Sequence, residues 1–290
     1  MKNYLLGAAL FATLFLCYCN PQETATAPVK AKKLIDRKKP VAAISYHYEQ
    51  GKRWVNDHKG DTAFLRLVAT INRADVKHIA AMDSILVPSD SIADMAYYLP
   101  FPVTVEAIKE IDKIIFFSYA TQAFAAYENG EMIYTGATNM GRKKDPTPTG
   151  LFYTNWKAET TTSTFNDEWE LKWNFNIENK LGVGWHQYEM PGYPASHSCL
   201  RLMEEDAKYL YEWAHQWELD KKEAVILKGT PVIVFGNYDF EGVKPWSALA
   251  ANPRALDISA ATISGIVSTY LPQIIAEQDK RNKRTVEDGM

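Results

Sequence analysis

The sequence predicts a mainly β protein whose central β unit has helices before and after it. Three short apolar segments between residues 114 and 138 have the length of strands. Two of them are joined by Asn129-Gly130, a dipeptide that favours a tight hairpin because both of its residues readily take positive φ. The only clear helical period within residues 112–236 follows Cys199. We therefore expect residues 112–236 to form a β-sandwich with one helix packed behind Cys199.

The remaining elements of this unit follow from apolar spacing. The expected strands cover residues 114–119, 122–127, 132–138 and 230–235, and the apolar positions of residues 203–217 recur at intervals of three and four, as on one face of a helix. Residues 156–185 are rich in aromatic side chains. This stretch is either a long functional loop or a β-meander whose aromatic side chains belong to the core.

A smaller unit is expected before the central domain and a helical tail after it. Residues 35–101 hold mixed patterns, with a helix at 64–71, Asn72 and a short strand ending at Pro88. This order faintly resembles a LysM-type glycan-binding module, and a small helical or α/β packing unit without a ligand is the alternative. Residues 237–290 carry the apolar spacing of one or two amphipathic helices.

The first residues have the pattern of a secretory signal peptide. Lys2 precedes an uncharged apolar run over residues 4–18, which is too short for a membrane-spanning helix. The end of residues 1–19 resembles a bacterial lipobox with Cys19 as the lipid-bearing residue, and a plain cleaved signal peptide is the alternative. Residues 20–34 are polar, which predicts a flexible linker. We expect an exported protein of the periplasm or cell envelope, anchored to the outer or inner membrane.

The charge of the chain argues against nucleic acid as a partner. The chain has 32 Lys and Arg against 35 Asp and Glu, a net charge of -3 and a sequence pI near 6.1. The cations are scattered rather than gathered into the basic stripe that would neutralise phosphates.

Cys199 is the cysteine that stays unpaired if Cys19 is lipidated and Cys17 leaves with the signal peptide. A single free cysteine is most often a small buried hydrophobe, but His186 and His197 lie close to it in sequence. The thiolate is the form that attacks carbonyl groups, and a nearby imidazole lowers the pKa of a thiol from about 8.5. We therefore expect a reactive thiol at Cys199.

Residues 192–201, Gly-Tyr-Pro-Ala-Ser-His-Ser-Cys-Leu-Arg, resemble the catalytic motif of the YkuD-type L,D-transpeptidases. Two further motifs of that family are similar in this chain, one from Gln122 to Phe152 with Pro-Thr-Pro-Thr-Gly near its end, the other at residues 229–232. The resemblance covers about residues 112–236. The sequence departs from the family pattern at Ser198, where Gly is usual, at Gln187, and in a shorter spacing between His186 and Cys199.

The resemblance implies a cysteine acyltransferase of the cell wall that uses no cofactor and no metal. Cys199 would be the nucleophile and His186 the base, within hydrogen-bond reach of the sulfur and oriented by the backbone carbonyl of Gln187. The supporting residues would include Ser196 and Ser198. His197 is either catalytic or a structural hydrogen bonder, and Arg201 either holds a substrate carboxylate or forms a salt bridge that fixes the Cys199 loop.

The reaction implied by the resemblance is acyl transfer from a peptidoglycan tetrapeptide stem, with release of its terminal D-Ala, to an amine for cross-linking or protein attachment. With water as acceptor the protein would be an L,D-carboxypeptidase. Two alternatives come from other classes: a metal site built from His186, His197 and Cys199, and a non-catalytic peptidoglycan-binding lipoprotein in which Ser198 has collapsed the site.

Overall fold

The computed structural model describes residues 44–91, 94–163 and 170–288. These residues belong to one unit of the chain, residues 32–290. The predicted signal peptide, the lipidation site Cys19 and the linker at 20–34 lie outside the described residues and stay predictions. No helix within the described ranges has the length and apolar character needed to cross a membrane.

The larger sheet has five strands in the order β5-β4-β3-β13-β6. Their bounds are β3 (Ile114–Ser118), β4 (Ala123–Glu128), β5 (Glu131–Ala137), β6 (Gly150–Tyr153) and β13 (Pro231–Phe235). β13 runs parallel to β3 and antiparallel to β6, and the β3-β4-β5 pairs are antiparallel. The predicted hairpin joins β4 to β5, where Asn129 and Gly130 have φ of 48° and 80°.

A second sheet has the order β10-β9-β8-β7. Its strands are β7 (Lys157–Thr162), β8 (Glu170–Glu178), β9 (Val183–Gln187) and β10 (Leu200–Leu202). The aromatic stretch thus forms an antiparallel meander, β7-β8-β9, and its Phe175 and Trp185 are completely buried. Of the two alternatives for this stretch, the β-meander is correct, although Leu171 of β8 also reaches the candidate site described below.

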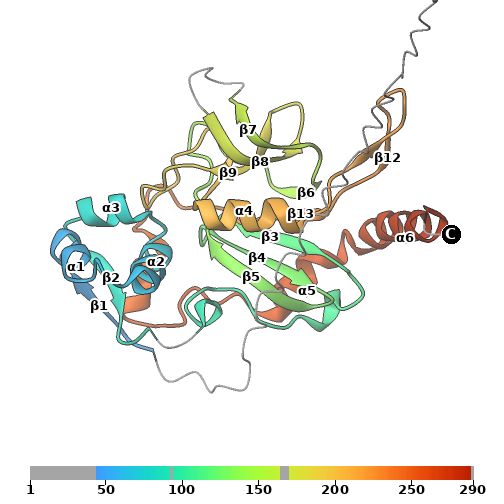
Figure 1. The fold of residues 1–290 in the computed structure, drawn as a ribbon. Helices are drawn as coiled ribbons and strands as arrows, with labels where there is room; N and C mark the ends of the chain where they lie inside the picture. Colours follow the sequence, from blue (N-terminus) through green and yellow to red (C-terminus); the bar gives the residue numbers. More distant parts are fainter. Residues whose placement is uncertain (1–43, 92–93, 164–169, 289–290) are drawn as a thin grey trace, which may run out of the picture. The chain divides into compact units, whose positions relative to one another are not determined.

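Helix α4 (Glu204–Trp213) lies between the two sheets in Figure 1 and confirms the helix expected behind Cys199. It shares a core with alternate residues of β3, Ile115 and Phe117, and with Leu200 of β10. The expected helix extended to residue 217, which is wrong: the chain becomes extended at Ala214, and the short strand β11 (Glu218–Leu219) pairs with β12 (Val225–Leu227).

The opposite face of the five-stranded sheet is covered by the C-terminal segment. Ile114 and Phe116 of β3 pack with Ile263, Val267 and Ile274. The last three come from α5 (Ala260–Ser268) and α6 (Leu271–Asp288), drawn in red in Figure 1, and a short 3-10 helix, η2 (Glu106–Ile108), packs on the same side. The mainly β fold with flanking helices is confirmed.

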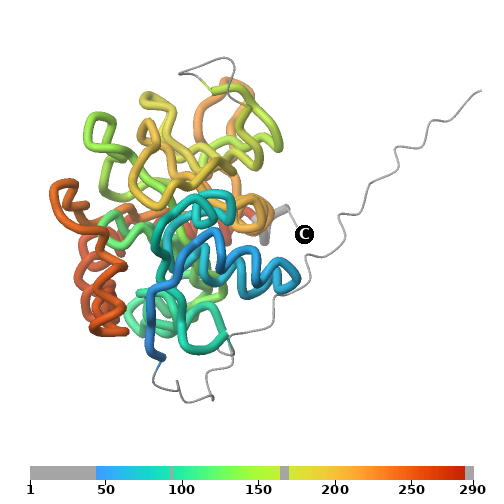
Figure 2. The backbone as a smooth tube through the Cα atoms, turned by 90° about the vertical axis from the view of Figure 1, so that its left-hand side faces the viewer, coloured from blue at the N-terminus to red at the C-terminus, as the bar shows by residue number. Residues whose placement is uncertain are grey.

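The N-terminal residues form a two-stranded sheet with three helices. β1 (Tyr46–Glu49) pairs antiparallel with β2 (Ile85–Pro88), and between them lie α1 (Gly51–Asp57), α2 (Thr62–Ile71) and α3 (Val76–Ala81). We call residues 44–91 the N-terminal unit; its helices are blue to cyan in Figure 2. Two more 3-10 helices are η1 (Met95–Tyr97) and η3 (Pro245–Ala250), and Trp246 of η3 packs against Tyr46 and Ile71.

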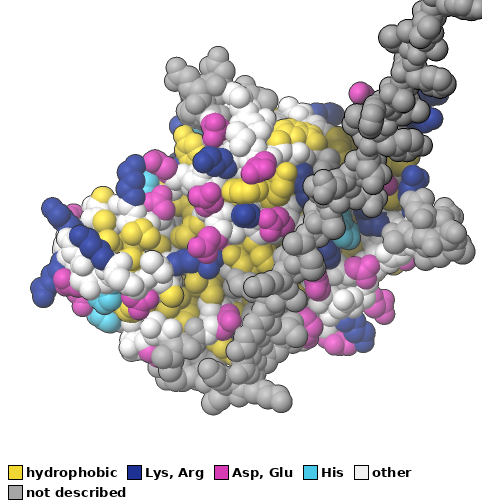
Figure 3. Space-filling model, in the orientation of Figure 1, with side chains coloured by type: hydrophobic (Ala, Val, Ile, Leu, Met, Phe, Trp, Pro, Cys, Tyr) yellow, Lys and Arg dark blue, Asp and Glu magenta, His cyan; other side chains and the backbone are white. Residues whose placement is uncertain are grey.

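The described surface is mixed in charge. On the face shown in Figure 3, lysine and arginine side chains alternate with aspartate and glutamate, and no large patch of one sign is visible. This distribution agrees with the scattered charges of the sequence.

Candidate active site

Strands β9 and β10 bring the two candidate catalytic segments side by side. They pair in parallel, with Trp185 opposite Leu200 and His186 opposite Arg201. Trp185 and Leu200 are completely buried in the core. Because side chains alternate along a strand, His186 and Arg201 emerge on the other face, and so does Cys199, which directly precedes Leu200.

One small pocket on this face collects the predicted site residues, except Gln187 and Ser198. Its lining residues are Ser163, Leu171, His186, Tyr188, Ser196, His197, Cys199 and Arg201. The thiol, both imidazoles and one guanidinium therefore share a single pocket, although the sequence places them on two separate segments.

His186 is held in one tautomer. Its side chain is buried, with 4% of the residue exposed, and Nδ1 lies 2.9 Å from the carbonyl oxygen of Gln187. A carbonyl only accepts, so Nδ1 carries the proton and Nε2 has a free lone pair. Burial lowers the pKa of His186 to about 4, with a smaller effect of the same sign from Arg201 and an opposing one from the Gln187 carbonyl. The imidazole is neutral at neutral pH.

Cys199 is a free, half-buried cysteine. Its thiol donates a weak hydrogen bond to the carbonyl oxygen of Gly182 at 3.9 Å, and no hydrogen bond joins it to His186. Burial raises the pKa of the Cys199 thiol, opposed by the backbone at Gly184 and by the charge of Arg201. The expectation of a lowered thiol pKa is wrong for this resting geometry, because the thiol is desolvated and His186 is uncharged.

The turn before Cys199 keeps the backbone conformation of a glycine. Ser198 has φ of 77°, in the left-handed region that L-residues other than glycine seldom adopt. The turn is closed by the Ser196 hydroxyl, which donates to the carbonyl oxygen of Cys199 at 2.6 Å. The departure from the family motif at Ser198 has therefore not collapsed the turn.

The loop that follows β5 stabilises the turn before Cys199 through hydrogen bonds. The Thr147 hydroxyl accepts from the Gly141 N–H at 2.8 Å and donates to the carbonyl oxygen of Ser198 at 2.9 Å. The Asn139 amide oxygen accepts from the Ala195 N–H at 3.1 Å, and its backbone pairs with Arg201. Neither residue was predicted to support the site, although Thr147 lies in the Pro-Thr-Pro-Thr-Gly motif of residues 146–150.

His197 is hydrogen-bonded away from the thiol. Its Nε2 lies 2.5 Å from an Nη of Arg142, which can only donate, so Nε2 is the acceptor. Arg142 in turn binds the Asp145 carboxylate through Nε at 2.6 Å. This geometry favours the structural alternative for His197.

Arg201 has a carbonyl and an aromatic ring as partners. Its guanidinium donates to the carbonyl oxygen of Glu189 at 3.2 Å and lies 4.5 Å from the ring centroid of Tyr188. Among the described residues it forms no ion pair with a carboxylate, so none of them provides the salt bridge considered as its alternative role. Burial lowers the pKa of Arg201, as expected for a cation without an anionic partner.

The family model of the YkuD L,D-transpeptidase catalytic domain matches residues 112–234. This segment belongs to the L,D-transpeptidase catalytic-domain family. It contains both sheets, α4 and every predicted site residue, while the N-terminal unit and α5–α6 lie outside it. The family resemblance of the three motifs is confirmed for this part of the chain.

Solved structures with partial similarity carry the same family name. An L,D-transpeptidase from Stackebrandtia nassauensis is 27% identical, with 44% of this chain and 57% of that one covered and a TM-score of 0.36. A mutant L,D-transpeptidase from Enterococcus faecium is 26% identical, with coverages of 43% and 50% and a TM-score of 0.34. An L,D-transpeptidase from Mycobacterium tuberculosis H37Rv is 19% identical, with 43% and 58% covered and a TM-score of 0.35. This chain therefore spans less than two thirds of each. A search of curated proteins returned no match.

The described part of the L,D-transpeptidase domain offers no metal centre. No group of three His, Cys, Asp or Glu side chains there is placed to hold a metal ion. The alternative of a metal site formed by His186, His197 and Cys199 has no geometric support.

Proposed function

We propose that this protein is a peptidoglycan L,D-transpeptidase in which Cys199 is the nucleophile and His186 the general base. The observation that carries the proposal is that the Cys199 thiol and the His186 imidazole, whose Nε2 is free, line one pocket. The membership of residues 112–234 in the family supplies the substrate class.

In the first half of the reaction, Sγ of Cys199 attacks the carbonyl carbon of the amide between the L-centre of a diamino acid and the terminal D-Ala of a tetrapeptide stem. The thiol proton passes to Nε2 of His186. The C–N bond then breaks, the D-Ala amine departs with that proton, and a thioester remains on Cys199.

In the second half, an amine of a neighbouring stem or protein attacks the thioester carbonyl. His186 takes the proton from the amine and returns it to Sγ as the C–S bond breaks, so both residues end as they began. If water takes the place of the amine, the product is a shortened stem and the protein is an L,D-carboxypeptidase.

The electrostatics of the pocket decide how the thiol is activated. With the pKa of the thiol raised and that of His186 lowered, the resting pair is a neutral thiol and a neutral imidazole. The proton therefore moves as Sγ attacks, rather than in a thiolate–imidazolium pair formed beforehand. The Arg201 guanidinium, which lines the same pocket and has no carboxylate partner among the described residues, is suited to hold a carboxylate of the stem.

Incubation with purified disaccharide-tetrapeptides, followed by chromatography and mass spectrometry of the products, tests the proposal. We expect release of D-Ala together with a cross-linked dimer, and neither product with Cys199→Ala. Release of D-Ala without a dimer would identify the carboxypeptidase. Binding of the muropeptide without any D-Ala release would instead support the non-catalytic peptidoglycan-binding lipoprotein.

Export, lipid attachment at Cys19 and glycan binding by the N-terminal unit stay predictions. The mass of the mature N-terminus from membrane fractions, compared between the native chain and Cys19→Ala, tests the first two. Retention on insoluble peptidoglycan tests the third.

A further inference from the structure

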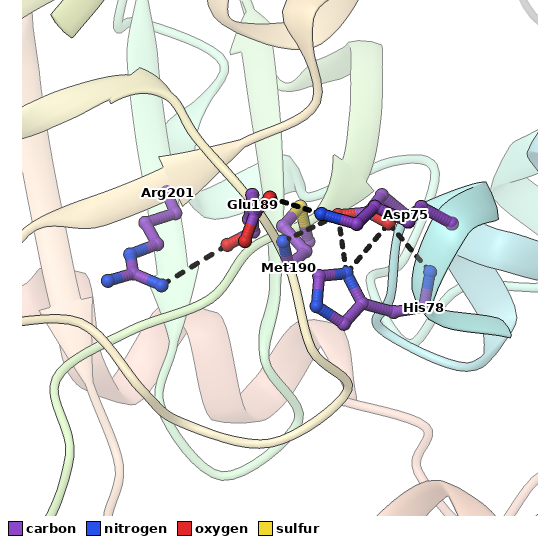
Figure 4. A network of polar contacts seen from close by, with 6 residues as sticks. Asp75, His78, Glu189, Met190 and Arg201 are labelled. Atoms are coloured by element: carbon purple, nitrogen blue, oxygen red, sulfur yellow. Dashed lines mark hydrogen bonds and ion pairs between the residues drawn. The ribbon is translucent and has the colours of Figure 1, made fainter. Parts of the chain in front are cut away.

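The N-terminal unit is joined to the catalytic domain next to the candidate site. Asp75 and Met190 form a reciprocal pair: the Asp75 N–H donates to the carbonyl oxygen of Met190 at 2.9 Å, and the Met190 N–H donates to Oδ2 of Asp75 at 2.9 Å (Figure 4). Asp75 is also the N-cap of α3, since its Oδ1 accepts from the His78 N–H at 2.9 Å. One carboxylate thus starts a helix and binds the catalytic domain.

The chain segment that Asp75 binds is the segment that holds Arg201. Residues 188–192 lie between His186 and Cys199, and we call them the bridging segment. The Glu189 carbonyl and the Tyr188 ring, which contact the Arg201 guanidinium, both belong to it. Figure 4 shows Glu189 between Arg201 on one side and Asp75 on the other.

Further contacts hold the bridging segment against the N-terminal unit. Ala74 forms a β-bridge with Pro191, and Lys77 forms an exposed ion pair with Glu189 at 2.7 Å. At Gly192, where φ is 78°, an added Cβ would come within 2.6 Å of the Met82 methyl group. The packing leaves this segment little freedom to move relative to α3.

We propose that Asp75 is a positioning residue for the catalytic site: it fixes the bridging segment and thereby places the Arg201 guanidinium where it recognises an anionic group of the substrate. The N-terminal unit, which lies outside the family domain, completes the site. The identification of this anionic group as a stem-peptide carboxylate rests on the proposed function. The placement of the guanidinium by Asp75 is independent of that function.

Asp75→Asn separates this role from helix capping. Asn is as good an N-cap as Asp, so α3 keeps its cap. Oδ1 and Oδ2 accept from different N–H groups, however, and an amide has only one oxygen. Either the His78 N–H or the Met190 N–H therefore loses its acceptor. If the single amide oxygen continues to cap α3, the Met190 N–H faces the NH₂ group.

Cys199 itself can report the position of the Arg201 charge. In the full chain, the rate of Cys199 alkylation would be followed by peptide mass spectrometry with iodoacetate, which is an anion, and with iodoacetamide, which is neutral and of similar size. A nearby guanidinium attracts the anionic iodoacetate and accelerates its reaction with Cys199 more than the reaction of neutral iodoacetamide. We expect the iodoacetate-to-iodoacetamide rate ratio to fall by about fivefold in Asp75→Asn, the effect of moving a unit charge by a few ångströms near a protein surface.

Two further variants provide reference values for this rate ratio. Arg201→Gln gives the ratio without the charge, and Asp75→Asn should approach it. Asp61→Asn is the control for helix capping, because the Asp61 side chain accepts from the Phe64 N–H as the N-cap of α2 and, among the described residues, forms no hydrogen bond or ion pair with the bridging segment. Removing a negative charge alone would raise the reactivity of the anionic reagent, so a lower ratio reports displacement of Arg201. An unchanged ratio in Asp75→Asn, or an equal fall in Asp61→Asn, would overturn the proposal.

The alkylation ratio needs no turnover, so it stays informative if the proposed function fails. If stem peptides are substrates, Asp75→Asn should also raise KM by a larger factor than it lowers kcat, because recognition and not chemistry is impaired. A fall in kcat at unchanged KM would contradict the role of Asp75 in substrate recognition.

Discussion

His186 lies directly opposite Arg201 across the parallel pair β9–β10, so that an imidazole and a guanidinium emerge side by side next to the thiol. The positive charge of Arg201 adds to burial in keeping His186 neutral. The Gln187 carbonyl fixes its proton on Nδ1. In the proposed mechanism, His186 is therefore a base that accepts the proton through Nε2 during attack and does not ionise the thiol in advance.

This arrangement predicts a specific outcome for His186→Ala. Turnover should fall by about a hundredfold or more, the usual effect of losing a general base. The apparent pKa of Cys199 alkylation by iodoacetamide should nevertheless change by less than about half a unit, since a neutral imidazole contributes little to thiolate stability. Rates of alkylation between pH 6 and 10 measure this.

His197→Ala provides the comparison. It should cost less activity, because His197 binds Arg142 rather than the thiol. A rise of a unit or more in the thiol pKa of His186→Ala would show that a thiolate–imidazolium pair exists in the resting enzyme.

The buried His186 also predicts how stability depends on pH. Its pKa is about 4 in the folded protein and about 6.5 when unfolded. The unfolded chain therefore binds more protons between these values, so the stabilisation is complete above pH 6.5 and is lost as pH falls toward 4. Between pH 7 and 4.5 this one group should lower the free energy of unfolding by about 2 kcal/mol. Urea denaturation of the native chain and of His186→Gln at both pH values isolates the contribution of His186 to the change in the free energy of unfolding. Equal pH dependence in the two proteins would contradict the lowered pKa.

Ser198→Gly should stabilise the protein. A non-glycine residue at φ of 77° is strained, by about 1–2 kcal/mol, and the greater freedom of glycine in the unfolded chain offsets part of the gain. The net increase in the free energy of unfolding should be about 0.5–1 kcal/mol, with activity kept. Ser198→Val, which adds β-branching at the same φ, should destabilise. Stabilisation by valine would mean that the turn is not left-handed.

Thr147→Val tests the support of the Cys199 turn from the β5–β6 loop. Valine has nearly the same shape but leaves the Gly141 N–H and the Ser198 carbonyl without their partner. An unsatisfied buried group costs about 1–3 kcal/mol, so the thermal midpoint should fall and kcat with it. Thr149→Val, two residues on at an exposed position, is the matched control and should behave like the native protein. Equal effects of the two substitutions would contradict the role given to Thr147.

The parts of the fold that the sequence predicted are those set by local chemistry. Asn129-Gly130 specified its hairpin because few residues accept positive φ, and the spacing of Ala207 and Leu210 specified one face of α4. The end of α4 was missed, because Trp217 continues the helical spacing while tertiary pairing of the next residues into β11 decides where the helix stops.

The motif predicted most of the side chains that line the candidate pocket, but it did not predict their electrostatics. Cys199 and His186 stand in a specific motif, but their pKa shifts come from burial, which depends on the packing of separate segments. The same holds for Asp75: nothing local marks it as more than a helix cap, and its contact with Met190 arises from a fold that joins residues 115 positions apart.

The measurement that tests the central claim most directly is the detection of a covalent acyl-enzyme. A disaccharide-tetrapeptide is mixed with the full chain, the reaction is quenched in acid within its first turnovers, and peptides are mapped by mass spectrometry. Nucleophilic attack by Cys199 predicts an adduct on that residue with the mass of the stem minus D-Ala, absent from Cys199→Ala. Cys199→Ala should keep a thermal midpoint within a few degrees of the native protein. Product formation in Cys199→Ala, or an adduct on any other residue, would contradict the assignment.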